Sequence, residues 1–68
     1  MLPAAHLIAD QMKRHVLDLC EHHEIQIEWS TRKAWSAHDL QLVHIPPIKS
    51  SISYAVALHE IGHVLGRH

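Results

Sequence analysis

The sequence predicts an α+β fold with an N-terminal helix, a small antiparallel sheet of two to three strands, and a C-terminal helix. Apolar residues recur every three or four positions up to about residue 24, and every second position over residues 25–29. Pro46 and Pro47 end the strand region, and a mainly apolar segment follows it. We expect one domain over residues 1–68, because so short a chain buries only about 60% of its unfolded surface and cannot form two cores.

The first helix is predicted from Pro3, which suits the start of a helix, to about Glu24. Its apolar stripe consists of Leu2, Ala5, Ala9, Met12, Val16 and Leu19. Charged residues lie on the other faces. Core packing is the stronger interpretation of this stripe, and a partner-binding surface is the alternative.

Three short strands are predicted next. The first covers residues 25–29, and a turn at residues 30–32 leads to a second strand at residues 33–37. His38 and Asp39 are expected to connect it tightly to a third strand, residues 40–45. This third strand is a candidate sheet edge to which an extended peptide could add, and the alternative is an internal strand with Leu40 and Leu42 buried.

The last helix is predicted to begin at Ser50 or Ser51, because either serine can cap it. One stripe of this helix contains Ile52, Val56, His59, His63 and Gly66, and the adjoining flank contains Tyr54, Leu58, Ile61 and Leu65. Glu60 is the acidic residue in the middle of this apolar segment. Such a carboxylate costs stability unless it is solvated in a cleft, paired, or close to a metal ion, so a functional role is predicted for it.

The segment His59-Glu60-Ile61-Gly62-His63 is an H-E-x-x-H motif. Because an α-helix advances about 100° per residue, side chains at i and i+4 leave the same face, and His59 and His63 are predicted to ligate one Zn²⁺. Zinc acidifies its bound water, and Glu60 is predicted to act as the general base in peptide-bond hydrolysis. The small residues Ala55, Gly62 and Gly66 allow other backbone to approach this face. The alternative is a coincidental histidine pair, since so short a motif also occurs by chance.

The spacing identifies no third protein ligand. In the metzincin pattern H-E-x-x-H-x-x-G-x-x-H, Gly66 occupies the glycine position, but His68 comes one residue too early. A continuing helix would point His68 away from the ligand face, so coordination by His68 requires a sharp turn at Gly66. No spacing supports His38, Asp39 or His44. Either the chain is a truncated form, or another chain or water completes the coordination.

Composition restricts the partners and the compartment. Six Lys and Arg residues against seven Asp and Glu residues give a formal net charge of -1, so nucleic acid and anionic membranes are not expected partners. The sequence has neither a basic leader nor an uncharged stretch of membrane-spanning length, and we expect a cytoplasmic protein. The single cysteine, Cys20, excludes an internal disulfide and is expected to pack rather than react.

Residues 35–37, 42–48 and 53–68 resemble the small zinc metallopeptidase-like proteins encoded by phages and prophages, distant relatives of the ImmA/IrrE-type metallopeptidases. The resemblance covers nearly the whole chain and is specific from about Trp35 onward. It implies a minimal zincin-like core with His59 and His63 as metal ligands, Glu60 as base, and a third, acidic ligand in a C-terminal helix. This sequence departs from the pattern by stopping at His68.

The sequence therefore predicts a zinc metallopeptidase, or its catalytic-core fragment, that acts on a peptide or protein substrate. The alternative is a non-catalytic, metal-stabilised interaction or regulatory domain of phage origin, in which zinc contributes folding energy and the first helix docks a partner. A homo-oligomer or a missing C-terminal segment would supply the third metal ligand.

Overall fold

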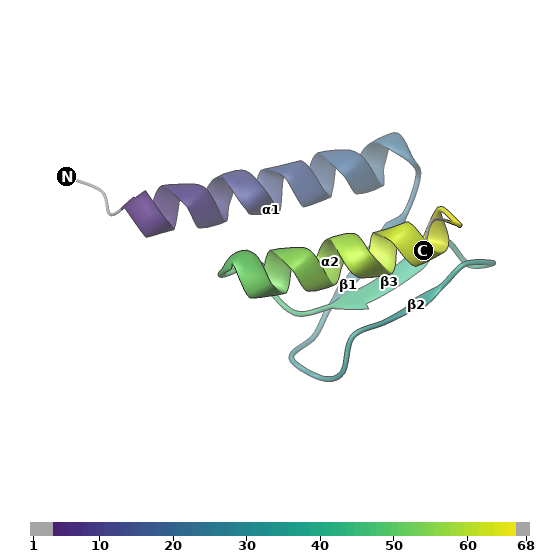
Figure 1. Ribbon diagram of the computed structural model, residues 1–68. Coiled ribbons are helices and arrows are strands. Elements are labelled where there is room, and N and C mark those ends of the chain that lie inside the picture. Colours follow the sequence, from purple (N-terminus) through teal and green to yellow (C-terminus); the bar gives the residue numbers. More distant parts are fainter. Residues whose placement is uncertain (1–3, 67–68) are drawn as a thin grey trace.

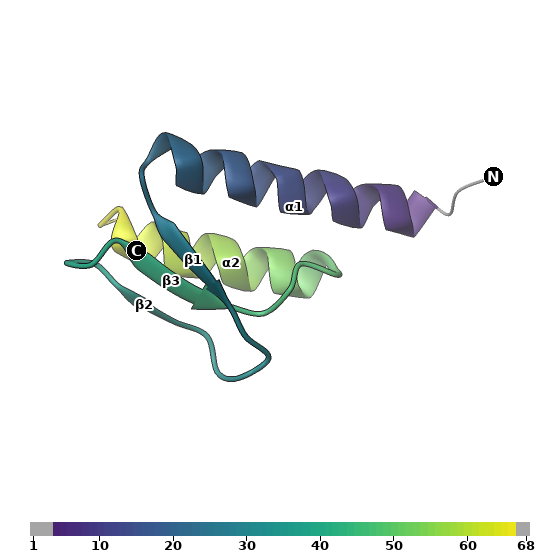
Figure 2. The same ribbon diagram turned by 180° about the vertical axis from the view of Figure 1, so that it is seen from behind.

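The computed structural model describes residues 4–66, with side chains described from residue 8 onward. Its elements are α1 (Ala4–His22), β1 (Gln26–Trp29), β2 (Trp35–Ala37), β3 (Leu42–Ile45) and α2 (Ser51–Val64). Figures 1 and 2 show that α2 covers one face of the sheet, that α1 lies beside α2, and that no helix covers the other face. The predicted α+β class, with a helix at each end of the strand region, is confirmed.

Helix α1 packs the apolar stripe predicted for it against the core. Val16 and Cys20 are buried, and Met12 and Leu19 are partly buried beside them. Leu2 lies outside the described residues. The helix ends where Glu24 takes a left-handed backbone conformation, with φ of 57°, and the Ile25 N–H donates to the Cys20 carbonyl over 2.8 Å. This reversal directs the chain into β1.

The sheet is mixed, and the prediction of a wholly antiparallel sheet was wrong for one of its two pairings. The strand order is β1-β3-β2, with β1 parallel to β3 and β2 antiparallel to β3. The chain reverses direction after β1 and again after β2, so β3 runs in the direction of β1. Residues 30–34 carry β2 to the far edge, and β3 therefore pairs with β1 directly.

Strand β3 is the central strand, so it is not the sheet edge that the sequence suggested for residues 40–45. Its Val43 and Ile45 are fully buried, whereas Leu42 and His44 alternate to the other side and are half-buried. Leu40 belongs to the turn between β2 and β3 and is 65% exposed, so only the strand itself is internal. The two edges of the sheet are β1 and β2.

Helix α2 begins and ends with well-defined caps. Ser50 is the N-cap, and its hydroxyl and that of Ser53 accept from each other's backbone N–H groups over 3.5 and 3.0 Å. The helix stops where Gly66 adopts a φ of 78°, a conformation that glycine reaches without steric cost. The buried core that α2 completes consists of Val16, Cys20, Ile25, Val43, Ile45, Ile48, Ala57, Ile61 and Val64.

Candidate metal centre

The rotation of α2 about its own axis decides where the motif side chains point. Ala57 and Ile61 are buried and mark the face of α2 that packs on the sheet. His59 follows Ala57 by two residues, about 200° around the helix, and it is exposed on the face directed away from the sheet. His63 lies one turn further along, is half-buried, and leaves the helix in nearly the same direction.

Glu60 lies on the flank of α2 that faces away from α1. Tyr54, three residues before Ala57, lies on the other flank, where its hydroxyl shares a hydrogen bond with Nδ1 of His15 on α1. Glu60, three residues after Ala57, lies about 60° to the opposite side and is half-buried. Figures 1 and 2 show α1 and β2 on opposite sides of α2.

The two motif imidazoles converge on each other. The Nε2 atoms of His59 and His63 are 3.0 Å apart, and the ring centroids are 4.4 Å apart with an interplanar angle of 88°. Two imidazole nitrogens at about 2.0 to 2.1 Å from a tetrahedral zinc ion would lie about 3.3 Å apart. The pair therefore fits two positions of a zinc site with an adjustment of a few tenths of an ångström.

The tautomers of the pair would differ between the metal-free state and a state with a bound cation. Without a cation, the 3.0 Å separation is a hydrogen bond in which one Nε2 carries a proton and donates to the other. A shared cation requires both Nε2 atoms to present lone pairs, so both imidazoles then carry their protons on Nδ1. A cation held by this pair would therefore require one proton to shift from Nε2 to Nδ1.

Among the side chains that the structure describes, those of residues 8–66, no three His, Cys, Asp or Glu residues form a group able to hold a metal ion. Glu60 does not form such a group with the two imidazoles. His68 lies outside the described residues. The turn at Gly66 that its coordination requires is present.

The other candidate ligands from the sequence lie elsewhere. His38 donates from Nδ1 to the carbonyl of Val64, one of the carbonyls that the end of α2 leaves without a helical partner. His44 stacks on Trp35 across the β2–β3 pair, with centroids 4.9 Å apart and planes 11° apart. Asp39 is exposed in the turn after β2. No spacing in the sequence indicates the His38 contact, because 26 residues separate its partners.

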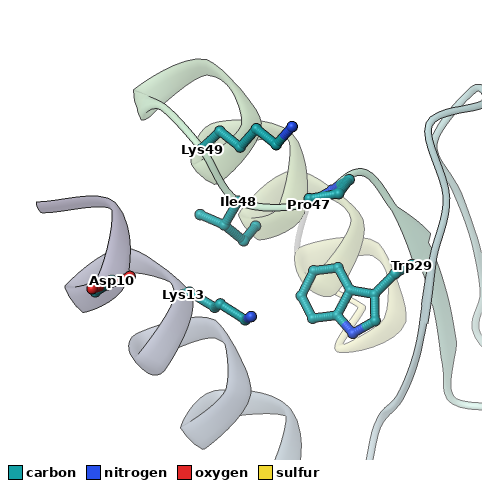
Figure 3. Close-up of a pocket in the computed structure, with 6 residues that line it drawn as sticks. All are labelled: Asp10, Lys13, Trp29, Pro47, Ile48 and Lys49. Carbon is teal, nitrogen blue, oxygen red and sulfur yellow. The ribbon is translucent and has the colours of Figure 1, made fainter. Parts of the chain in front are cut away.

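A pocket of about 370 Å³ lies apart from the motif, between α1 and the segment that precedes α2 (Figure 3). It is lined by Asp10, Lys13, Trp29, Pro47, Ile48 and Lys49. The ammonium group of Lys13 lies 5.8 Å from the centroid of the Trp29 ring, within the range of a cation–π contact. The sequence did not predict this pocket, and none of the motif residues lines it.

Comparisons with protein-family models, with curated proteins and with solved structures found no match for this chain. Neither helix in residues 4–66 has the length and apolar content needed to cross a membrane.

Proposed function

We propose that this chain is a zinc-dependent metallopeptidase, or the catalytic core of one, in which His59 and His63 hold the metal and Glu60 is the general base. The observation that carries the proposal is the convergence of the two Nε2 atoms to 3.0 Å, with the half-buried Glu60 directly after His59 in the chain. A bound zinc ion would supply Lewis-acid chemistry, acidifying a water molecule and polarising a peptide carbonyl. The fold supports the proposal because both imidazoles leave α2 on an accessible face.

Glu60 would move the proton that hydrolysis requires. As a carboxylate, it accepts a proton from the attacking water and then gives it to the amine of the leaving peptide. Glu60 directly follows His59 in the chain, and helical spacing places it outside the i, i+4 pair of imidazoles. Glutamine has the same shape but cannot take up that proton.

The outer edge of β2 is where we place an extended peptide substrate. Strand β2 pairs only with β3 in the strand order, so its other side offers backbone N–H and C=O groups for strand addition. The same strand lies on the side of α2 that is turned away from α1 (Figure 1), and helical spacing relative to Tyr54 and Ala57 assigns Glu60 to that side. A peptide added there would lie alongside the base. We therefore propose that the peptide pairs with residues 35–37, and not with residues 40–45 as the sequence suggested.

Glu60→Gln tests the proposal on the zinc-loaded chain with a library of quenched-fluorescence peptides. We expect zinc binding to be retained and turnover to fall by about 10² to 10⁴-fold, the usual contribution of a general base. Glu21→Gln, an exposed carboxylate on α1, is the matched control and should leave turnover unchanged. Equal turnover in Glu60→Gln and the parent chain would refute the role of Glu60.

The second candidate function is a metal-stabilised, non-catalytic domain. It differs from the first in that Glu60 has no role, and zinc contributes folding energy alone. In that case zinc raises the thermal stability of the parent chain and of Glu60→Gln equally, because zinc then acts only by binding the folded state. No peptide of the library is cleaved by either protein.

A further inference from the structure

The pocket between α1 and the segment that precedes α2 combines positive charge with apolar walls (Figure 3). Lys13 belongs to α1, and Lys49 belongs to the segment before α2. The apolar surface comes from Trp29, Pro47 and Ile48. The volume of about 370 Å³ is near the lower end of the range of about 300 to 1,000 Å³ that is usual for ligand pockets, so it suits a small molecule.

The backbone around this pocket is held in place by the core and by hydrogen bonds. Ile48 is 6% exposed and belongs to the buried core. Trp29 is the last residue of β1, and the backbone N–H of the next residue, Ser30, donates to the last carbonyl of β3 over 2.9 Å. The backbone N–H of Lys49 donates to the Ser53 hydroxyl over 2.9 Å, within the cap of α2. A ligand that binds here therefore has little backbone to order, which lowers the entropic cost of binding.

The charges of the lining favour a ligand with one negative charge. Lys13 and Lys49 are two of the six Lys and Arg residues in a chain whose formal net charge is -1, and Asp10 is the carboxylate of the lining. Figure 3 shows the Lys13 side chain between those of Asp10 and Trp29, so an anion beside the indole is closer to the ammonium group than to the carboxylate. A phosphate monoester carries nearly two negative charges, and the Asp10 carboxylate repels the second. A carboxylate ligand therefore fits this lining better than a phosphate.

The Trp29 ring indicates the apolar part of the ligand. It is 42% exposed, and its centroid lies 5.8 Å from the Lys13 ammonium group. A carboxylate that accepts from this ammonium group would therefore bring the group attached to it next to the indole. A flat aromatic group attached there would gain both ring–ring contact with Trp29 and apolar contact with Ile48.

We propose that this pocket binds an aromatic carboxylate, with the carboxylate held by Lys13, the ring packed against Trp29, and Lys49 adding to the positive potential. The inference goes beyond the metallopeptidase proposal and does not depend on zinc, because no residue of the histidine motif lines the pocket. Two sources have this chemistry: a free aromatic acid, and the C-terminal residue of a peptide that ends in an aromatic side chain.

An NMR titration of the full chain with N-acetyl-phenylalanine tests the proposal, in the presence of a chelator so that zinc makes no contribution. The signal of the Trp29 indole N–H is identified with Trp35→Phe, which removes the other tryptophan. We expect this signal to shift with a Kd of about 0.1 to 1 mM, the affinity usual for a ligand of about 15 non-hydrogen atoms.

Three comparisons separate the contributions of charge and ring. N-acetyl-phenylalanine amide, which lacks the charge, and the variant Lys13→Met should each weaken binding about tenfold, the loss expected for one hydrogen bond between charged groups. N-acetyl-glycine, which lacks the ring, should also bind more weakly. Lys33→Met removes an exposed lysine outside the pocket and is the matched control, which should bind like the parent. Circular dichroism checks that both lysine variants remain folded.

The proposal is overturned if the Trp29 signal does not shift, if the acid and its amide bind equally, or if Lys13→Met binds like the parent. Tighter binding of phenyl phosphate than of N-acetyl-phenylalanine would overturn the choice of a carboxylate. Within the proposal, an acetylated tripeptide that ends in phenylalanine distinguishes the two sources: tighter binding than N-acetyl-phenylalanine indicates a peptide C-terminus, and equal or weaker binding indicates a free acid.

Discussion

The rotation of α2 can be tested by substituting two residues that lie close together in the sequence. Ile61 is 1% exposed and packs in the core, whereas His59 is exposed on the opposite face. The two variants to compare are Ile61→Val, which removes one buried methyl group, and His59→Ala, which removes a whole imidazole from the surface. We expect Ile61→Val, although it is the smaller chemical change, to lower the free energy of unfolding more than His59→Ala.

The magnitudes follow from burial. Removing one methyl group from a buried isoleucine costs about 0.5 to 1.5 kcal/mol in the free energy of unfolding. An exposed substitution away from special features usually changes that free energy by less than about 0.5 kcal/mol. A domain of 68 residues has roughly 3 to 10 kcal/mol of total stability, so the loss at Ile61 is readily measured. At this size, 1 kcal/mol corresponds to a shift of about 4 to 8 °C in Tm.

Thermal unfolding followed by circular dichroism measures both variants, with a chelator present so that metal binding makes no contribution. We expect a Tm several degrees below that of the parent for Ile61→Val and a nearly unchanged Tm for His59→Ala. If His59→Ala were the less stable of the two, His59 would be part of the core. The accessible metal pair, and the function proposed from it, would then be wrong.

Three further predictions concern the ends of the helices and the buried thiol. His38→Ala leaves the last carbonyl of α2 without its partner and should lower the free energy of unfolding in urea by about 0.5 to 1.5 kcal/mol, whereas Asp39→Ala in the same turn should not. Glu24→Gly removes the cost of a left-handed non-glycine residue and should raise Tm, with a gain of about 0.5 to 1 kcal/mol, while Glu24→Ala should give no gain. Burial raises the pKa of the Cys20 thiol from the ordinary 9.0 to about 11. Because the unfolded chain loses this proton first, stability in urea should fall as pH rises from about 9 toward 11, and Cys20→Ala should remove that part of the pH dependence.

Local patterns predicted most of the elements. The apolar spacing around Val16 and Leu19 corresponds to the packed side of α1, and the serine before the last helix is its cap. These features depend on residues within a few positions of each other, so the sequence contains them directly. Local patterns do not contain the strand order, because the alternation of apolar residues shows which residues share a face of a strand and not which strand lies next to it. That is why the parallel β1–β3 pairing and the central position of β3 were missed.

In the candidate site, too, contacts between residues close in the sequence were predictable and contacts between distant residues were not. His59 and His63 converge because they are four residues apart in one helix, so the sequence was sufficient to predict their proximity. His38 holds the end of that helix from 26 residues away, and the sequence assigned it only as an unsupported ligand candidate. The contact depends on the turn after β2 reaching the C-terminal end of α2, which only the assembled sheet determines.

Two interleaved stripes on α2 explain how one short helix serves both the core and the site. Ala57, Ile61 and Val64 recur at the helical period and are buried, whereas His59 and His63 recur at the same period on the opposite face. Each stripe repeats every turn, so the packing of the first sets the direction of the second. The packing of α2 on the sheet therefore sets the direction in which the two imidazoles leave the helix. The proposed site requires the helix to be held at one rotation, and the core supplies that constraint.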